Sequence, residues 1–324
     1  MSSERLDTGG LERYDSLFIA PHGDDVALGC PARVQGENER GRRVLVLALF
    51  EPVGSDTPAA RAVRGLGADY ASAGLPAALE RRGTAPREIL AERSPEDEAV
   101  ALEAARLLTE TGPRTQAVHV YAPLGLGASV DHRLTYEAAV RAFATEAGRN
   151  LFLYEERPEA FVPGAVRTRL ALLGARLPPG AARAAARASL LRHLWRVNEP
   201  ERLRGNPLGL GGRLRALAGA RRRLVLARPW NPLRAFGPRL QPIVHVADED
   251  ARERAQAIAA SLLPADRKGR PRPAQRFEVR ARAAAKALGG VYHAERFWLF
   301  LPSGDGLPEI QHPLEMGSRD GVRS

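Results

Sequence analysis

Four mostly apolar runs in the first half of the chain alternate with longer segments of mixed polarity. The runs are Ser16–Ala20, Arg43–Phe50, Ala117–Ala122 and Asn150–Tyr154. Runs of this length that are apolar on both alternating faces are typical of strands buried inside a parallel sheet. The pattern therefore predicts four core strands.

The segments between these runs carry helix signals. Ser94-Pro95-Glu96-Asp97 supplies an N-cap, a first-turn proline and acidic residues that favour a helix N-terminus. This helix is expected to end at Gly112, and a second one to run from near Asp131 to Gly148. The alternation predicts an α/β fold, with a Rossmann-like, mainly parallel sheet and helices on both faces.

The second half of the chain is less regular. Proline and glycine breaks between residues 163 and 240 predict short helices in an Arg-rich insert or lid. Regular patterns return as helices at Asp248–Leu263 and Phe277–Leu288 and a final strand at Val291–Phe300. We expect one α/β domain over residues 1–324, with the insert inside it and a loosely held tail at 302–324.

Composition is that of an ordinary globular protein, with 44% hydrophobic and 27% charged residues. The longest apolar run, Val44–Phe50, is far shorter than the roughly 18 residues that span a bilayer. The polar segment MSSERLDTGGLERYD is not expected to be a secretory signal, and the single cysteine, Cys30, excludes an internal disulfide. A cytoplasmic enzyme without a membrane span is expected.

The net charge of +10 raises the question of a nucleic-acid partner. The basic residues are almost all arginine, with lysine only at Lys268 and Lys286, which indicates codon bias more than selection for a partner. Between residues 163 and 240 the only acidic residues are Glu199 and Glu201. A solvated basic face is the favoured interpretation, and a surface for an anionic substrate, a membrane or nucleic acid is the alternative.

The segment Ala20-Pro21-His22-Gly23-Asp24-Asp25 follows the first predicted strand. Ligands of open α/β sheets bind beyond the carboxyl ends of the strands. An imidazole and two carboxylates so close together are costly unless a cation gathers them. His22 and Asp25 can share one metal ion across a tight turn, which leaves Asp24 to face a metal-bound water.

A third ligand is available after the third predicted strand. A glycine-containing loop there leads to Asp131 and His132 at the start of a helix, so His132 can complete the ligand set and Asp131 can orient an imidazole. Two histidines and one carboxylate suit catalytic Zn²⁺, and they also suit Fe²⁺ or another divalent metal. Taken singly, each motif also fits a helix or turn cap, and the pair at two strand ends is more specific.

These segments resemble the LmbE-like, PIG-L-type N-acetylglucosaminyl deacetylase family. The similarity lies in PHGDD at Pro21–Asp25, SVDH at Ser129–His132, YAPLGLG, LYEERP and VYHAERF. The resemblance implies a zinc-dependent hydrolase that removes an acyl group, usually acetyl, from an amino sugar or a related glycoconjugate. It also implies that His22, Asp25 and His132 bind the metal and that Asp24 is the general base.

Several positions depart from the family pattern: Gly23 and Val26 replace its usual proline and acidic residue, its Arg-and-Glu pattern after the second strand is missing, and Ser129 differs as well. Ser129 stands where the family has a histidine that supports the tetrahedral intermediate or the leaving amine. Serine can donate a hydrogen bond but carries no positive charge. His293, in the final predicted strand, is a candidate substitute for that histidine.

Two alternative functions stay open. The first is a metal-binding family member with little or no catalysis, because of Ser129. The second is a protein that uses its basic middle segment to bind an anionic ligand or nucleic acid. A dinucleotide enzyme is disfavoured because no Gly-x-Gly-x-x-Gly follows the first strand.

Overall fold

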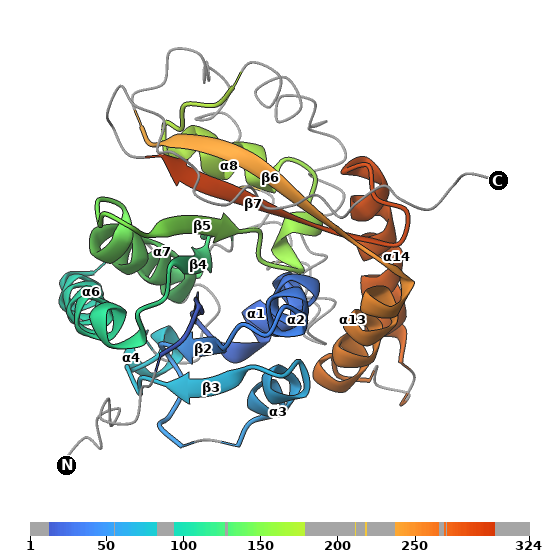
Figure 1. The fold of residues 1–324 in the computed structure, drawn as a ribbon, viewed down its shortest axis with the longest axis horizontal. Coiled ribbons are helices and arrows are strands. Elements are labelled where there is room, and N and C mark those ends of the chain that lie inside the picture. The colour runs from blue at the N-terminus through green and yellow to red at the C-terminus, as the bar shows by residue number, and fades with distance from the viewer. Residues whose placement is uncertain are drawn as a thin grey trace.

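A computed structural model describes residues 13–54, 56–82, 94–126, 129–178, 237–265 and 271–301, with residues 211, 218 and 269 standing alone. Within these ranges seven strands form one sheet in the order β3-β2-β1-β4-β5-β7-β6 (Figure 1). The strands are β1 (Ser16–Ala20), β2 (Val44–Ala48), β3 (Asp69–Ser72), β4 (His119–Pro123), β5 (Asn150–Tyr154), β6 (Arg239–Ala247) and β7 (His293–Leu301).

The first five strands of the sheet are parallel. β1 lies between β2 and β4, with β3 beyond β2 and β5 beyond β4. β7 pairs antiparallel with both β5 and β6, so the sheet is mixed only on one side. The predicted α/β fold with a mainly parallel sheet is confirmed, and β1 and β5 have the predicted bounds.

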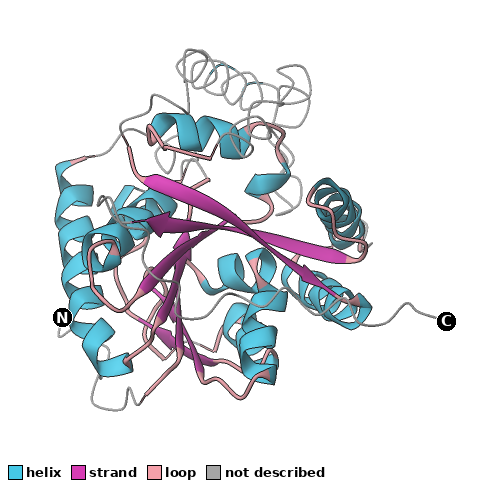
Figure 2. Ribbon diagram, turned by 45° about the horizontal axis from the view of Figure 1, so that its top comes forward, coloured by secondary structure: helices cyan, strands magenta, loops and turns pink. Residues whose placement is uncertain are grey.

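Helices cover both faces of this sheet (Figure 2). Successive residues of β1 enter different hydrophobic clusters because side chains alternate along a strand. Leu17 and Ile19 pack in the cluster that includes residues of α6 and α7. Phe18 and Ala20 pack in the cluster that includes residues of α1, α2 and α3. The helices are α1 (Gly23–Gly29), α2 (Pro31–Glu39), α3 (Pro58–Gly65), α6 (Pro95–Thr115) and α7 (Val130–Phe143).

The C-terminal elements return to the N-terminal half of the fold. Helix α13 (Glu249–Leu262) contacts α1, α2 and α3, and α14 (Arg272–Ala287) contacts β7. α14 begins at Arg272 rather than at the predicted Phe277. The remaining described elements are α4 (Ala78–Arg82), the 3-10 helix η2 (Glu159–Phe161) and α8 (Ala165–Leu172).

The apolar pattern did not predict the two edge strands, β3 and β6. β3 is short and its first residue, Asp69, is exposed. β6 contains Pro242, which an edge strand tolerates because one row of its backbone N–H groups has no ladder partner. Edge strands contribute fewer buried side chains to the core than inner strands do, so the apolar pattern in their sequences is weaker.

Much of the predicted basic insert, residues 179–236, lies outside the described residues except for positions 211 and 218, and so does the tail at 302–324. The short helix α8 lies in the described part of the predicted insert. None of the described helices combines the length and the apolar character that crossing a membrane requires.

Candidate active site

The His22–Asp25 segment forms the start of a helix, where a loop was expected. β1 ends at Ala20, His22 is the extended N-cap residue, and α1 begins at Gly23. Backbone N–H groups in a first turn lack helical partners, so carboxylates are stabilised there. The His22 N–H donates to Asp25 Oδ2 at 3.1 Å, which fixes the buried Asp25 side chain one turn from the imidazole.

Glu51 anchors this helix start, a role that the sequence had not indicated. The Gly23 N–H donates to its Oε1 at 2.7 Å and the Tyr70 hydroxyl to its Oε2 at 2.7 Å. A Cβ on Gly23 would meet the Tyr70 ring at 2.9 Å, so the packing requires glycine here. The only signal in the sequence was an acidic residue soon after the second apolar run.

Helix α7 brings His132 to the same end of the sheet, because β4 neighbours β1. His132 Nε2 lies 3.5 Å from Asp25 Oδ1, and its ring centroid lies 6.5 Å from that of His22. Side chains from positions more than a hundred residues apart therefore meet. The three predicted metal ligands, His22, Asp25 and His132, are brought together at the carboxyl ends of β1 and β4.

Asp131 faces His22 rather than its neighbour His132. Its Oδ2 lies 3.5 Å from His22 Nε2. The carboxylate also accepts hydrogen bonds from the Ala78 N–H at 2.9 and 3.0 Å and from Arg81 Nη2 at 3.0 Å. This carboxylate is held firmly enough to set the orientation of the His22 ring.

Asp24 has a different environment from Asp25. It is half-buried, and it forms no hydrogen bond or ion pair with any residue that the structure describes. Its charge still influences Asp25, His22 and Tyr70, so it lies beside them. An unengaged carboxylate with access to solvent is what a general base requires.

The acidic surroundings shift the pKa values of the ligand candidates. Burial raises the pKa of Asp25, which the opposing charge of His132 only partly offsets. Burial alone lowers the pKa of His132, but Asp25 and the hydrogen bond to Glu156 raise it by more. Burial likewise lowers the pKa of His22, and the Asp131 hydrogen bond reverses this. The site as a whole favours positive charge.

Glu156 is a second residue that the sequence had not singled out, although it lies within the LYEERP segment. It follows β5, is fully buried, and places Oε1 at 3.3 Å from His132 Nδ1. A carboxylate in this position leaves Nε2 as the ligating nitrogen of the imidazole. Its sequence signal was an acidic residue at the end of a strand.

Two of the predicted supporting residues, Ser129 and His293, lie in different surroundings. Ser129 is the half-buried N-cap residue of α7, and its side chain makes no capping hydrogen bond. His293 is buried at the start of β7, with Nε2 at 3.0 Å from Glu295 Oε1 and 3.5 Å from Arg157 Nη1. Asp131 and His132, which follow Ser129 closely in the sequence, lie at the candidate site, whereas these contacts of His293 include none of the predicted metal ligands.

The donor set fits a divalent metal in its chemistry. Among the described residues no three His, Cys, Asp or Glu side chains already form a ligand group; His132 lies near Asp25, and His22 lies near Asp131. The buried Oε2 of Glu156 has no hydrogen-bond partner there. Buried carboxylates with incomplete pairing need a cation, and two imidazole nitrogens with one carboxylate suit zinc.

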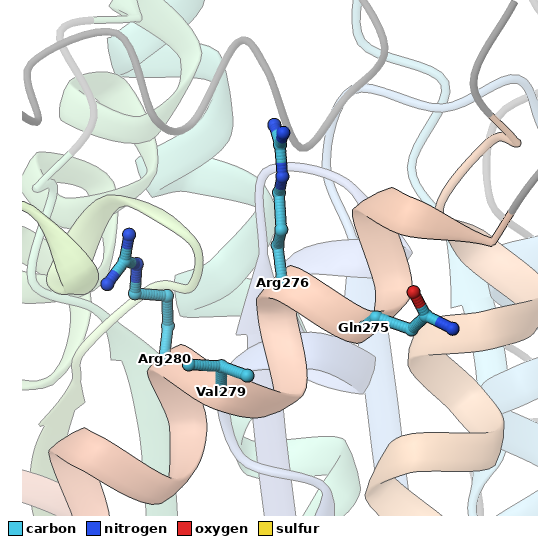
Figure 3. Close-up of a pocket in the computed structure, with 4 residues that line it drawn as sticks. All are labelled: Gln275, Arg276, Val279 and Arg280. Atoms are coloured by element: carbon cyan, nitrogen blue, oxygen red, sulfur yellow. The ribbon is translucent and has the colours of Figure 1, made fainter.

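Two cavities lie elsewhere on the described surface. One, of about 310 Å³, is lined by α14, from which Arg276 and Arg280 project (Figure 3). The other, of about 260 Å³, is lined by α7 and α8 residues that include Arg133 and Arg169. The described residues that line them include none of the predicted catalytic or metal-binding residues.

The chain matches no protein-family model and no curated protein. Its fold is similar to solved structures at low sequence identity. A teicoplanin deacetylase, Orf2, in a zinc-inhibited form has a TM-score of 0.54 at 15% identity, over 90% of this chain and 99% of that one. A deacetylase–teicoplanin complex from the teicoplanin biosynthesis pathway has a TM-score of 0.55 at 15% identity, with the same coverage. At this identity the similarity establishes the fold, which these deacetylases share with the present chain.

Proposed function

We propose that this protein is a metal-dependent amide hydrolase that removes an acyl group, in the first instance acetyl, from an N-acylated amino sugar or a sugar-containing metabolite. The observation that carries the proposal is the meeting of His22, Asp25 and His132 at adjacent strand ends, with the unengaged Asp24 beside them. Similar folds occur in deacetylases of teicoplanin biosynthesis, which favours the same reaction class.

His22, Asp25 and His132 would hold the metal, with Zn²⁺ as the first candidate and Fe²⁺ or another divalent ion as the alternative. The chemistry that such an ion supplies is polarisation of the amide carbonyl and acidification of a water molecule. Asp131 and Glu156 keep the imidazoles of His22 and His132 in position.

Asp24 would accept the proton of the attacking water and return it to the leaving amine. The environment of Asp24 supports this role, because no described residue forms a hydrogen bond or an ion pair with its carboxylate. Ser129 stands at the entry to α7 with a hydroxyl that can donate to the carbonyl oxygen.

Metal content tests the binding site first. We expect about one equivalent of zinc or iron in protein purified without chelator, and its loss in His132→Ala. Elemental analysis of the two proteins measures this. No metal in the wild type, and none taken up on reconstitution, would overturn the proposal.

Asp24→Asn tests the base separately from the metal. We expect retained metal and a loss of acetate release from N-acetyl amino sugars of about 10²–10⁴-fold, the usual contribution of a general base. Asp56→Asn is the matched control, because Asp56 is an exposed carboxylate paired with Arg61 and Arg64. An Asp24→Asn variant as active as the control would refute the assignment of the base.

A further inference from the structure

One buried carboxylate oxygen connects the His132 ring to the loop that precedes α7. Oε1 of Glu156 accepts the Gly125 N–H at 2.7 Å and the Leu126 N–H at 2.9 Å, and lies 3.3 Å from His132 Nδ1. Three contacts on one oxygen fix its position closely. The loop and the imidazole therefore share a single anchor.

The anchor determines which nitrogen of His132 is available. An ionised carboxylate can only accept hydrogen bonds, so Nδ1 must carry the proton that faces Glu156. When the ring is neutral, as a metal ligand must be, its lone pair is then on Nε2, the nitrogen that faces Asp25 Oδ1 at 3.5 Å. Glu156 thus presents His132 to the other predicted metal ligands in the required tautomer.

Few described groups contact the charge of Glu156 directly, and the nearby buried cation Arg169 interacts with it only through space. Its side chain is fully buried, Oε2 has no hydrogen-bond partner, and His132 is the only described side chain that forms an ion pair with it. The buried Glu37 differs, because both Arg33 and Arg42 pair with it and Ser16 donates to it. A buried carboxylate with so few direct partners is costly, and a further cation linked to it lowers that cost.

We infer that Glu156 is a positioning residue for the metal centre: it holds His132 with Nε2 toward the ligand group and ties the Gly125–Leu126 loop to the same carboxylate. A cation bound through His132 would compensate the charge of Glu156 across the ring, so metal affinity depends on a residue that does not touch the metal. This inference rests on the proposed function, because it requires a metal at His132.

The test compares two neighbouring glutamates. Glu156→Gln keeps the shape and an acceptor oxygen for the two loop N–H groups while it removes the charge. Glu155→Gln is the matched control, because Glu155 is also buried but accepts from Trp298 Nε1 at 2.9 Å and from Arg296 Nε at 2.5 Å, on β7. Zinc affinity of each metal-stripped protein is measured by competition with a chromophoric chelator.

We expect Glu156→Gln to bind zinc about 10–100-fold more weakly than the wild type, the usual effect of losing such a partner, and Glu155→Gln to bind like the wild type. Equal affinity in the wild type and both variants would overturn the role of Glu156 and leave the proposed function intact. A wild type that binds no zinc would overturn the proposed function and this inference with it.

A second measurement uses only the wild-type protein, so it does not depend on whether a variant folds. In zinc-loaded wild-type protein labelled with ¹⁵N at histidine, NMR should show His132 bound to the metal through Nε2, with a protonated, downfield-shifted Nδ1–H. A purely structural role for Glu156 does not predict that signature. Coordination through Nδ1, or an Nδ1 without its proton, would contradict the inference.

Discussion

Adjacent residues of the candidate site have opposite environments. Asp25 is 3% exposed and contacts the His22 N–H and His132, whereas Asp24 is half-buried and has no partner within the described chain. Successive side chains of a helix point about 100° apart, so Asp25 turns toward His132 while Asp24 faces the solvent side. Helix geometry at α1 thus gives the proposed ligand and the proposed base different environments in two consecutive positions.

Ser129 is the residue at which a single substitution should raise activity. Its side chain makes no capping hydrogen bond to α7, so replacing it should cost the helix little. Ser129→His would add a group that can carry positive charge beside the developing oxyanion, and we expect acetate release to rise by on the order of 10²-fold. Steady-state kinetics on N-acetyl amino sugars measure this change.

The control for that substitution is Ser129→Ala, which should release acetate no faster than the wild type. Metal content should be the same in all three proteins. An unchanged rate in Ser129→His would mean that the serine does not limit catalysis.

Three helices meet at one buried arginine behind the site. Arg81 of α4 is 1% exposed in its side chain, and its Nη2 lies 3.1 Å from Asp97 of α6 and 3.0 Å from Asp131 of α7. The α4 residue Ala78 also donates its N–H to Asp131. The position of the Asp131 carboxylate, which faces His22, therefore depends on how α4 and α6 are packed.

Removal of this cation should destabilise the whole fold. Arg81→Met removes the cation that two buried carboxylates share, and we expect the free energy of unfolding to fall by about 3–5 kcal/mol, as for other broken buried ion pairs. Urea denaturation followed by circular dichroism measures the loss. Arg106→Met, on the exposed face of α6 beside Glu103 and Glu110, should change stability little. Similar losses in both variants would contradict the assigned role of Arg81.

At the scale of the whole molecule, β7 joins the end of the described chain to its beginning. Glu295 of β7 accepts hydrogen bonds from the Ala32 N–H at 2.8 Å and the Arg33 N–H at 2.9 Å, in the first turn of α2. Unpaired N–H groups of a helix start favour a carboxylate, so this contact stabilises both elements. The strand at the end of the described chain is therefore tied to helix α2 through contacts between residues more than 260 positions apart.

Because the Glu295 carboxylate is buried and charged, the free energy of unfolding should fall when acid protonates it. Burial raises the pKa of Glu295, but the hydrogen bond and charge of His293 and the charge of Arg157 lower it by more, so it lies below its ordinary value. A lowered folded-state pKa contributes stability above the unfolded-state pKa of about 4.3, and the contribution disappears as pH falls through the folded-state value.

Glu295→Gln should therefore be less stable than the wild type at pH 7, by about 1–3 kcal/mol, the cost of an impaired buried hydrogen-bond group. The difference should shrink as the pH falls below about 4, where the wild-type carboxyl becomes protonated. Urea unfolding at several pH values measures both proteins. Glu103→Gln, an exposed partner of Arg106, is the control and should show little difference at any pH. A gap for Glu295→Gln that stays constant down to acid pH would rule out this linkage.

Local patterns determined much of the fold. The apolar runs located β1 and β5 within their bounds, and the Ser94 cap located the start of α6, because burial and capping act on neighbouring residues. The ligand candidates His22, Asp25 and His132 were also found locally, since each follows a strand of the parallel sheet. Which residues have chemistry-bearing side chains at strand ends can be read from the sequence alone.

The groups that surround these ligand candidates depend on the tertiary fold. Glu51 and Glu156 look like ordinary acidic residues in the sequence, and their roles arise because β2 and β5 end beside the helix starts of α1 and α7. Asp131 was expected to orient an imidazole, and the packing of α4 decides that this imidazole is His22 rather than the neighbouring His132. Such contacts depend on strand order and helix packing between distant segments, which no local pattern records.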